Sequence, residues 1–296
     1  MKKSNRQILR SWISNNSTLY SIGKSTHRTY CKVTGPIHTL PNFLIIGAAK
    51  GGTSSLYDYL IQHPNVFSCI IKEPNYFSMY FDRSAEWYRS FFPFSFSKYY
   101  FEKIKKKKFV TGEASTEYYW HPHAPKRAQQ IVPNAKIIFL LRNPADRAFS
   151  HYQMCCRAGI EQLSFEEAIK REEERTSEEY QKMLKDEYYF SAKFSSYAYI
   201  RKSIYIDFIQ NWMKYFPKEQ FMFIKSESFF ENPGKILNDV LKFLELPELK
   251  LSQYKITRQG IYEKMDNKIR NKLLTYFKPH NEKLYKFLDS DFGWER

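Results

Sequence analysis

The stretch Phe43-Leu-Ile-Ile-Gly-Ala-Ala-Lys-Gly-Gly-Thr-Ser-Ser55 decides the fold of this chain. It begins with an apolar run that ends in a glycine, which is typical of a strand buried inside a parallel sheet. Apolar residues then recur at helical spacing until His63-Pro64, so the pattern predicts a helix over Thr53–His63. A strand, a short loop and a helix are therefore expected in direct succession.

A second apolar run, Lys136–Leu141, predicts another buried strand. It stops at Asn143-Pro144, where Asn143 can cap a helix and Pro144 can take the first helical position. Shorter strands are expected at 109–112 and 221–225, and helices near 125–132, 164–186, 199–216, 233–246, 267–277 and 282–288. Strands that alternate with helices predict an α/β protein with three layers, a central parallel sheet flanked by helices in a P-loop-like fold.

Length and composition limit the class of protein. The chain has 296 residues, of which 43% are hydrophobic and 18% aromatic, enough to bury a sizeable core. Without repeats or a glycine-rich linker, one domain is expected over residues 41–296, after a basic N-terminal extension of residues 1–40. No apolar run reaches the roughly 18–20 residues of a membrane span. The four cysteines form no CxxC pair, which predicts no disulfide frame and no metal site and favours a cytoplasmic location.

Positive charge is concentrated at the start of the chain. The net charge is +16, and residues 1–57 hold eight Lys or Arg and no acid. This composition fits an organelle-targeting segment and fits a solvated basic tail equally. The remaining excess indicates an anionic partner, which at this level can be nucleic acid, an anionic glycan, a phosphorylated cofactor or a lipid headgroup.

Three of the ten glycines, Gly47, Gly51 and Gly52, fall within six residues. Glycines there allow a sharp turn and close approach to a ligand, while the start of the following helix offers backbone donors. The expected occupant is a phosphate. Lys50 stands earlier in the loop than the lysine of a nucleoside triphosphatase, and no strand ends in an aspartate that would hold magnesium, so a kinase or ATPase fits poorly.

A second candidate motif follows the other strong strand. Arg142 leaves its carboxyl end, where open α/β sheets bind ligands, and Ser150 comes two turns into the next helix. An arginine with a nearby hydroxyl suits a phosphate monoester. Taken alone, these residues are explained equally well as a helix cap and a surface arginine.

Together the two motifs resemble the cofactor-binding motifs of the sulfotransferases: a 5′-phosphosulfate loop ending in KGGT-S, and an arginine followed by a serine for a 3′-phosphate. The resemblance covers residues 41–296 and is closest to the branch of heparan sulfate sulfotransferases and similar bacterial enzymes. It extends to the stretches Lys72–Phe77, Tyr199–Glu227, Tyr276–Asn281 and Asp291–Trp294.

The resemblance implies an enzyme that transfers a sulfuryl group from 3′-phosphoadenosine 5′-phosphosulfate (PAPS) to a hydroxyl or amine. It assigns the 5′-phosphosulfate to Lys50 and to the backbone of Gly51, Gly52, Thr53 and Ser54, with Lys50 neutralising charge on the leaving phosphate. It assigns the 3′-phosphate to Arg142, Ser150 and, on a loose match, Arg258.

Glu73 is the expected catalytic base, because the family's glutamate base lies in a comparable stretch after the first helix. A surface acid paired with Lys72 is the simpler alternative for this residue. A histidine base, as in the cytosolic small-molecule branch, is the rival, but no histidine of this chain lies in a better motif.

Some features limit the choice of acceptor. Ala114 stands where heparan-type enzymes carry a lysine, and neither a membrane anchor nor the final-loop disulfide of the Golgi relatives is found. Heparan is therefore a doubtful substrate, and we expect a carbohydrate or glycolipid acceptor, with no nucleic acid and with peripheral membrane contact left open. The lysine run 103–108 fits an acceptor groove or a solvated loop. A nucleic-acid-binding module and a P-loop NTPase or kinase remain the alternative functions.

Overall fold

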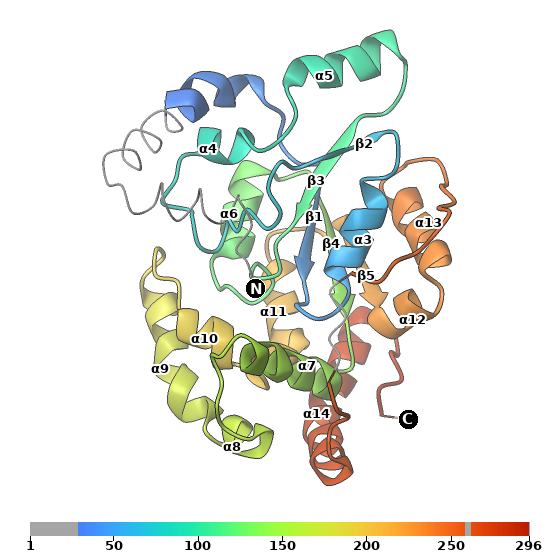
Figure 1. Cartoon of the computed structure of the whole chain (residues 1–296). Coiled ribbons are helices and arrows are strands. Elements are labelled where there is room, and N and C mark those ends of the chain that lie inside the picture. The colour runs from blue at the N-terminus through green and yellow to red at the C-terminus, as the bar shows by residue number, and fades with distance from the viewer. Residues whose placement is uncertain (1–28, 258–261, 296) are drawn as a thin grey trace, which may run out of the picture.

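A computed structural model describes residues 29–257 and 262–295 of the chain. Its centre is a five-stranded sheet in the order β2-β3-β1-β4-β5, and every pair of neighbours is parallel (Figure 1). The strands are β1 (Phe43–Gly47), β2 (Val66–Ser68), β3 (Val110–Ala114), β4 (Lys136–Leu141) and β5 (Phe221–Lys225). The predicted α/β class with a central parallel sheet is confirmed.

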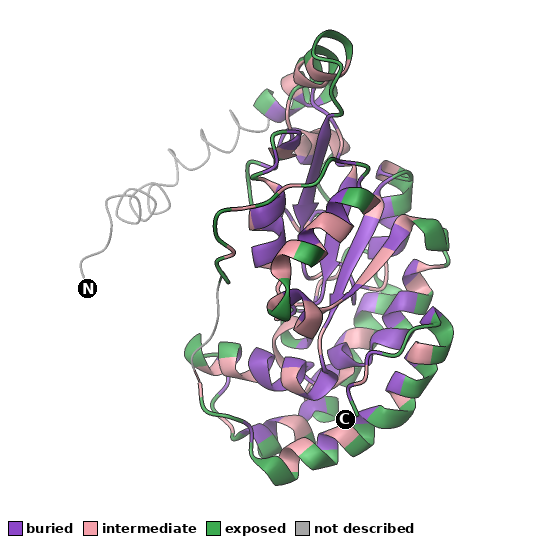
Figure 2. Ribbon diagram, turned by 90° about the vertical axis from the view of Figure 1, so that its right-hand side faces the viewer, coloured by how far each residue is buried: buried purple, intermediate pink, exposed green. Residues whose placement is uncertain are grey.

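Helices cover both faces of the sheet because successive residues of each strand point to opposite sides. Phe43 and Ile45 of β1 pack with α3 (Thr53–Leu60), α12 (Ser226–Glu231) and α13 (Pro233–Phe243). Leu44 and Ile46 belong to the larger core on the other face, with α6 (Ala124–Ile131), α7 (Pro144–Arg157), α11 (Tyr205–Trp212) and α14 (Asn267–Leu288). Figure 2 shows the buried strands between these two helical layers.

Strand β2 was missed in the sequence, because three residues at the edge of the sheet are too few for an apolar pattern to show. The remaining elements are short: η1 (Gly35–Ile37), α4 (Ala85–Arg89), α5 (Ser95–Tyr99), the π-helix η2 (Tyr100–Ile104), α10 (Ala192–Tyr197), η3 (Arg201–Ser203) and η4 (Lys218–Gln220).

Four of the expected helices need correction. The expected helix over 164–186 is two helices, α8 (Phe165–Lys170) and α9 (Glu172–Lys185), and the one expected over 199–216 becomes η3 followed by α11. In both cases the cause is tertiary, since the buried Glu172 carboxylate accepts hydrogen bonds from the backbone N–H groups of Ile200 and Arg201. The two helices expected after residue 267 are one helix, α14, which continues through Pro279. Its buried stripe runs unbroken on either side of the proline, so packing outweighs the lost backbone hydrogen bond.

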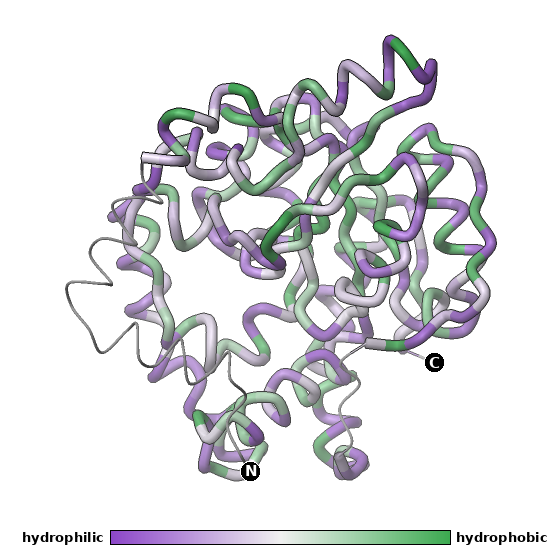
Figure 3. The backbone as a smooth tube through the Cα atoms, turned by 45° about the horizontal axis from the view of Figure 1, so that its top comes forward, coloured by the Kyte–Doolittle hydropathy of each residue, from purple (hydrophilic) through white to green (hydrophobic). Residues whose placement is uncertain are grey.

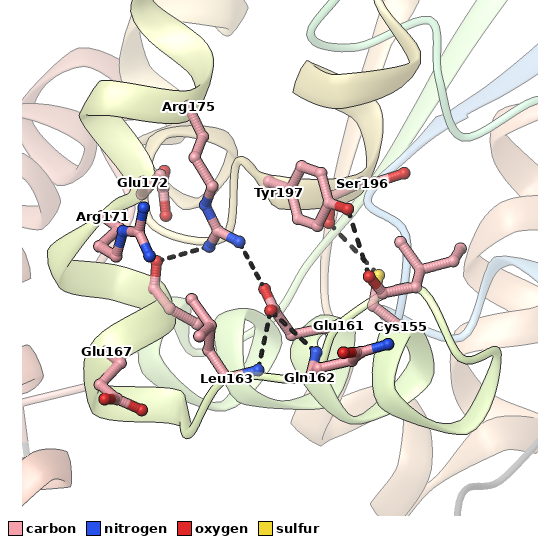
Figure 4. A network of polar contacts seen from close by, with 12 residues as sticks. Cys155, Glu161, Gln162, Leu163, Glu167, Arg171, Glu172, Arg175, Ser196 and Tyr197 are labelled. Atoms are coloured by element: carbon pink, nitrogen blue, oxygen red, sulfur yellow. Dashed lines mark hydrogen bonds and ion pairs between the residues drawn. The ribbon is translucent and has the colours of Figure 1, made fainter.

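Glu161 fastens the α8–α10 region to the end of α7 (Figure 4). Its carboxylate accepts hydrogen bonds from the backbone of Gln162 and Leu163 and from Arg175 Nη1 at 2.9 Å. Burial of Glu161 opposes its charge, yet the hydrogen bonds from Leu163 and Arg175 hold the pKa below its usual value. The carboxylate is thus a buried structural anchor.

Three sequence-based expectations meet the described residues differently. Most of the basic extension, residues 1–28, and Arg258 lie outside them. Within residues 29–257 and 262–295, no helix combines the length and apolar character needed to cross a bilayer. The four cysteines all lie in this part of the chain, and no disulfide joins them.

Candidate functional site

The predicted site residues gather at one edge of the sheet. Lys50 follows β1, Glu73 follows β2 and Arg142 follows β4, so all three lie at carboxyl ends of parallel strands. Strand β1 has β3 on one side and β4 on the other. After β1 the chain forms β2 and β3 on one side of it and then crosses to the other side for β4 and β5 (Figure 1). Such a switch point opens a crevice where α/β proteins bind ligands.

The loop after β1 is compact and held by backbone hydrogen bonds. Ala48 N donates to Leu140 O at 2.8 Å, and Gly51 N donates to Ala48 O at 2.9 Å. A Cβ at Gly51 would lie 3.0 Å from both carbonyl oxygens, which is closer than ordinary contact. Gly52 caps α3 with φ 100°, a conformation that favours glycine. The glycine cluster is therefore required by the geometry of this turn.

Helix α3 begins directly behind the loop. Its first backbone bond joins Leu56 N to Gly52 O, so the N–H groups of Thr53 and Ser54 have no acceptor within the helix. Free N–H groups and the positive end of the helix dipole together suit an anion. This geometry fits the phosphate that the sequence predicts here.

A hydrogen bond joins the two predicted motifs. Arg142 Nη1 donates to the backbone oxygen of Lys50 at 3.1 Å, and the Arg142 backbone oxygen accepts from Tyr205 Oη at 2.9 Å. Asn143 caps α7 by accepting from Ala145 N and Asp146 N, as predicted. The end of β4 is thereby fixed against the loop after β1.

Buried cations lie behind this junction. His151 is fully buried, and burial together with the charges of Lys202, Arg147 and Lys50 holds its pKa well below the usual value. Burial also lowers the pKa of Lys202 to about 8, while its Nζ donates to Ser195 O at 2.5 Å. A neutral histidine among cations indicates a positive local field, which suits an anionic ligand. Neither Arg147, His151 nor Lys202 was predicted, because each lies in a helical pattern that carries no motif.

Ser150 lies beside His151 on α7 and is only 2% exposed. The charge of Lys50 contributes to the lowered pKa of His151, so the part of α7 that carries Ser150 and His151 lies near Lys50. Of the residues predicted for the 3′-phosphate, Arg142 and Ser150 are both on the β4–α7 unit. The chain before the third, Arg258, is held at α3, since Thr257 N donates to Ser55 Oγ at 2.8 Å and Thr257 Oγ1 to Asp58 Oδ2 at 2.9 Å.

Glu73 stands in a tight turn. Its φ is 56° and that of Asn75 is 49°, both in the left-handed region that non-glycine residues seldom adopt. Asn75 N donates to Ser115 Oγ at 3.1 Å, and Ser115 Oγ donates to Glu113 Oε2 at 2.6 Å. The turn that carries Glu73 is thus attached to the end of β3.

Glu113 is an acid that the sequence analysis did not select. It is 1% exposed and also accepts hydrogen bonds from Tyr88 Oη and Tyr118 Oη. Burial raises its pKa to about 7, against the effect of its hydroxyl partners, and the nearby charge of Glu73 adds to the rise. The two carboxyl groups are therefore electrostatic neighbours. A glutamate directly after the strand expected over 109–112 was the available signal.

The segment after β3 runs along the end of β1. Ser115 N donates to Ile45 O at 3.1 Å and Tyr119 N donates to Ile46 O at 3.2 Å, while the Tyr119 ring would meet a Cβ at Gly47. Ala114, for which the resemblance predicts a lysine, is buried in β3. Hydrogen bonds thus connect the turn that carries Glu73, the end of β3 and the loop after β1.

Two other features lie apart from this edge. A cavity of about 860 Å³ between α8, α9, α10 and α14 is lined by none of the predicted site residues that the structure describes. The lysine run 103–108 precedes β3 and lies at the amino end of the sheet, so it does not line a groove beside Lys50. No group of three potential metal ligands occurs among the described residues.

Comparison with known proteins agrees with this geometry. The family model described as "Sulfotransferase domain" matches residues 40–291. A membrane-associated sulfotransferase, kil1, of Dictyostelium discoideum is 26% identical over 92% of this chain and 70% of its own length. Heparan sulfate glucosamine 3-O-sulfotransferase 6 of Mus musculus is 25% identical over 86% of this chain and 74% of its own. A crystal structure of a sulfotransferase from Alicyclobacillus acidocaldarius matches 87% of this chain and 100% of that chain, with 29% identity and a TM-score of 0.67.

Proposed function

The chain belongs to the sulfotransferase family, and from this premise we propose that it transfers a sulfuryl group from PAPS to a hydroxyl or amine of a carbohydrate acceptor. The observation that carries the proposal is the hydrogen bond from Arg142 Nη1 to Lys50 O. It connects the motif expected for a 5′-phosphosulfate to the motif expected for a 3′-phosphate. Membership of this family leaves no support for the alternatives of a nucleic-acid-binding module or an NTPase.

PAPS supplies, when bound, an SO₃ group on a phosphate leaving group. We propose that Lys50 neutralises the charge that develops on that phosphate, together with the N–H groups of Gly51, Gly52, Thr53 and Ser54. These donors are held in place before the reaction by the hydrogen bonds of the loop. Donors fixed in advance are effective because no reorganisation is needed as charge develops.

Arg142, Ser150 and Arg258 are proposed to bind the 3′-phosphate. Arg142 offers its remaining guanidinium N–H groups beside the loop, and Ser150 offers a hydroxyl from α7. The buried cations Arg147 and Lys202 add positive potential from behind. Selection of an adenosine 3′,5′-bisphosphate unit over other adenine nucleotides would follow from this second phosphate site.

Glu73 is proposed as the general base. A base must lie within hydrogen-bond reach of the acceptor atom that attacks, and Glu73 projects from a turn that the Asn75–Ser115–Glu113 hydrogen bonds hold in place. The acceptor proton passes to the Glu73 carboxylate while the bond from the acceptor oxygen or nitrogen to sulfur forms. Lys50 would stabilise the electron pair that the phosphate keeps when the bond from sulfur to the bridging oxygen breaks.

A carbohydrate acceptor is proposed because the matched relatives include a heparan sulfate glucosamine 3-O-sulfotransferase. Glycolipid is the second candidate. Ala114 removes one cation that heparan-type enzymes carry near the reacting group, so an acceptor with less negative charge than heparan is favoured. The sulfotransferase domain is proposed to begin near residue 41. The protein is proposed to act in the cytoplasm and to contact a membrane peripherally, since the relative kil1 is named as membrane-associated.

The test is transfer of labelled sulfate from PAPS to a panel of glycans, glycolipids and small phenols. The unmodified chain should label a carbohydrate, and Lys50→Ala should lower the rate by about 10²–10³-fold. Glu73→Gln should lower the turnover number with little change in PAPS affinity, because the base touches only the acceptor. Full activity of the Glu73→Gln variant would refute the role of the base, and phenols as sole substrates would refute the acceptor class.

A further inference from the structure

One segment stands out from the body of the molecule. Residues 94–108, named here the α5–η2 segment, connect Pro93 to β3 by way of α5 and η2. Figures 1 and 2 show it at the end of the sheet opposite α7. Because β3 begins just after it, the segment lies at the amino end of the strands, away from Lys50 and Arg142.

The base of the segment is firmly held. Phe94 pairs with His38 in an antiparallel bridge, with ring centroids 4.1 Å apart. The Phe101 ring packs on Phe67 at 4.7 Å. At the C-terminal end of the segment, Lys108 Nζ lies 2.6 Å from Glu245 Oε2. These contacts attach both ends of the segment to the body of the molecule.

Its outer surface is apolar and aromatic to an unusual degree. Phe96 is 74% exposed, Ile104 60% and Tyr99 57%, with Phe94 and Tyr100 also exposed. Clustered exposed apolar side chains of this kind mark interaction sites. The alternation of hydrophobic and hydrophilic residues along the segment can be followed in Figure 3.

Lysines alternate with these side chains along the segment. Residues 94–108 contain six lysines and one acid, Glu102, so the segment carries a net charge of six minus one, or +5. The lysines at 103, 105, 106 and 107 are exposed. A surface that carries both exposed aromatic side chains and a lysine cluster complements a bilayer with anionic headgroups, since the rings enter the interface and the ammonium groups pair with phosphates.

We propose that the α5–η2 segment docks this enzyme onto anionic membrane surfaces. A second copy of the chain is a poorer occupant, because two surfaces of charge +5 repel each other. Nucleic acid would use the lysines but would leave the exposed aliphatic side chain of Ile104 in water. Docking in this orientation places the carboxyl-end site on the side away from the bilayer, so the acceptor would reach the site from the aqueous phase. A glycolipid acceptor in the same bilayer would lie out of reach of that site, so this docking favours a water-soluble carbohydrate acceptor.

The test is co-sedimentation of the full chain with vesicles of phosphatidylcholine, with and without about one third phosphatidylserine. The chain should bind the anionic vesicles and not the neutral ones. Each lysine contributes about fivefold to binding, so the triple variant Lys103→Gln, Lys105→Gln, Lys107→Gln should weaken binding by about 10²-fold. The variant Phe96→Ser, Ile104→Ser should also bind more weakly, at unchanged net charge.

The matched control removes three exposed lysines of α14, at the other end of the molecule: Lys278→Gln, Lys283→Gln and Lys286→Gln. This variant should keep binding within about twofold, and circular dichroism checks that all variants fold. Equal binding by the α5–η2 triple variant, as expected if residues 1–28 alone carry it, would overturn the proposal. So would an equal loss in the α14 control, or tighter binding of single-stranded RNA that is lost in the same triple variant.

Discussion

Replacing Gly51 by alanine tests the proposed phosphate-binding loop after β1 at its tightest point. The new Cβ would lie 3.0 Å from Ala48 O and from Leu140 O, and 3.1 Å from Ser226 Oγ. Both carbonyl oxygens already accept hydrogen bonds that shape the loop, so neither can move away without breaking one. The loop must therefore shift by a few tenths of an ångström. Overpacking of this kind costs about 1–3 kcal/mol of stability.

The same shift displaces the donors of the loop and of α3 from the position proposed for the leaving phosphate. Misplacement of such groups lowers rates by up to about 10²-fold, so we expect Gly51→Ala to lower kcat/KM by about 10–10²-fold. Affinity for adenosine 3′,5′-bisphosphate should fall about tenfold. Calorimetric titration and thermal melting measure the two effects separately, and steady-state kinetics gives the rate.

Gly159→Ala provides the control. Gly159 has φ 72° and no atom within 4 Å of an added Cβ, so alanine there costs about 1 kcal/mol of backbone strain and touches nothing. Melting should shift in both variants, but nucleotide affinity only in Gly51→Ala. If Gly51→Ala binds the bisphosphate as the unmodified chain does, the loop does not act as described.

Three further predictions follow from single contacts. The pKa of Glu113 is raised to about 7 in the folded chain, so its stabilising contribution is complete below pH 4.5 and is lost as the pH rises through 7. Glu113→Gln should therefore reduce the fall in melting temperature between pH 4 and 8, by an amount worth up to about 3 kcal/mol over that whole range; an unchanged pH profile would contradict the assignment. Asn143→Ala removes the cap of α7 and should cost about 1 kcal/mol in urea unfolding, with no cost expected if the cap is unimportant. Ser55→Ala removes the acceptor of Thr257 N. Because Arg258 follows Thr257 and is proposed to bind the 3′-phosphate, this variant should bind the bisphosphate severalfold more weakly. An unchanged affinity would show that the chain around Thr257 does not contribute to the site.

Strands β1, β3, β4 and β5 and the two motif-bearing loops were predictable because their signals are local. Lys136–Leu141 is a strand at the predicted residues, and Asn143 caps the helix that follows. An apolar run that ends at a glycine or at Asn-Pro indicates within a few residues both that the segment is a strand and where the strand ends. Lys50 and Arg142 could be expected near each other, because both follow strands of the same parallel sheet.

What the sequence did not show depends on contacts between distant segments. Hydrogen bonds from the backbone of residues 200 and 201 to Glu172 accompany the division of the helices expected over 164–186 and 199–216. Pro279 stays helical because α14 packs against the protein on both sides of it. Glu113 and Lys202 were missed for the same reason. Their altered pKa values come from burial, which is set by the surrounding fold and has no counterpart in the spacing of residues.

The most direct test of the phosphate-binding edge is calorimetric titration with adenosine 3′,5′-bisphosphate. The unmodified chain should bind one equivalent, and it should bind adenosine 5′-monophosphate far more weakly because that nucleotide lacks the 3′-phosphate proposed to bind Arg142. Lys50→Ala and Arg142→Ala should each weaken bisphosphate binding at least about tenfold. A folded chain that binds neither nucleotide, or whose affinity is unchanged in both variants, would contradict the account.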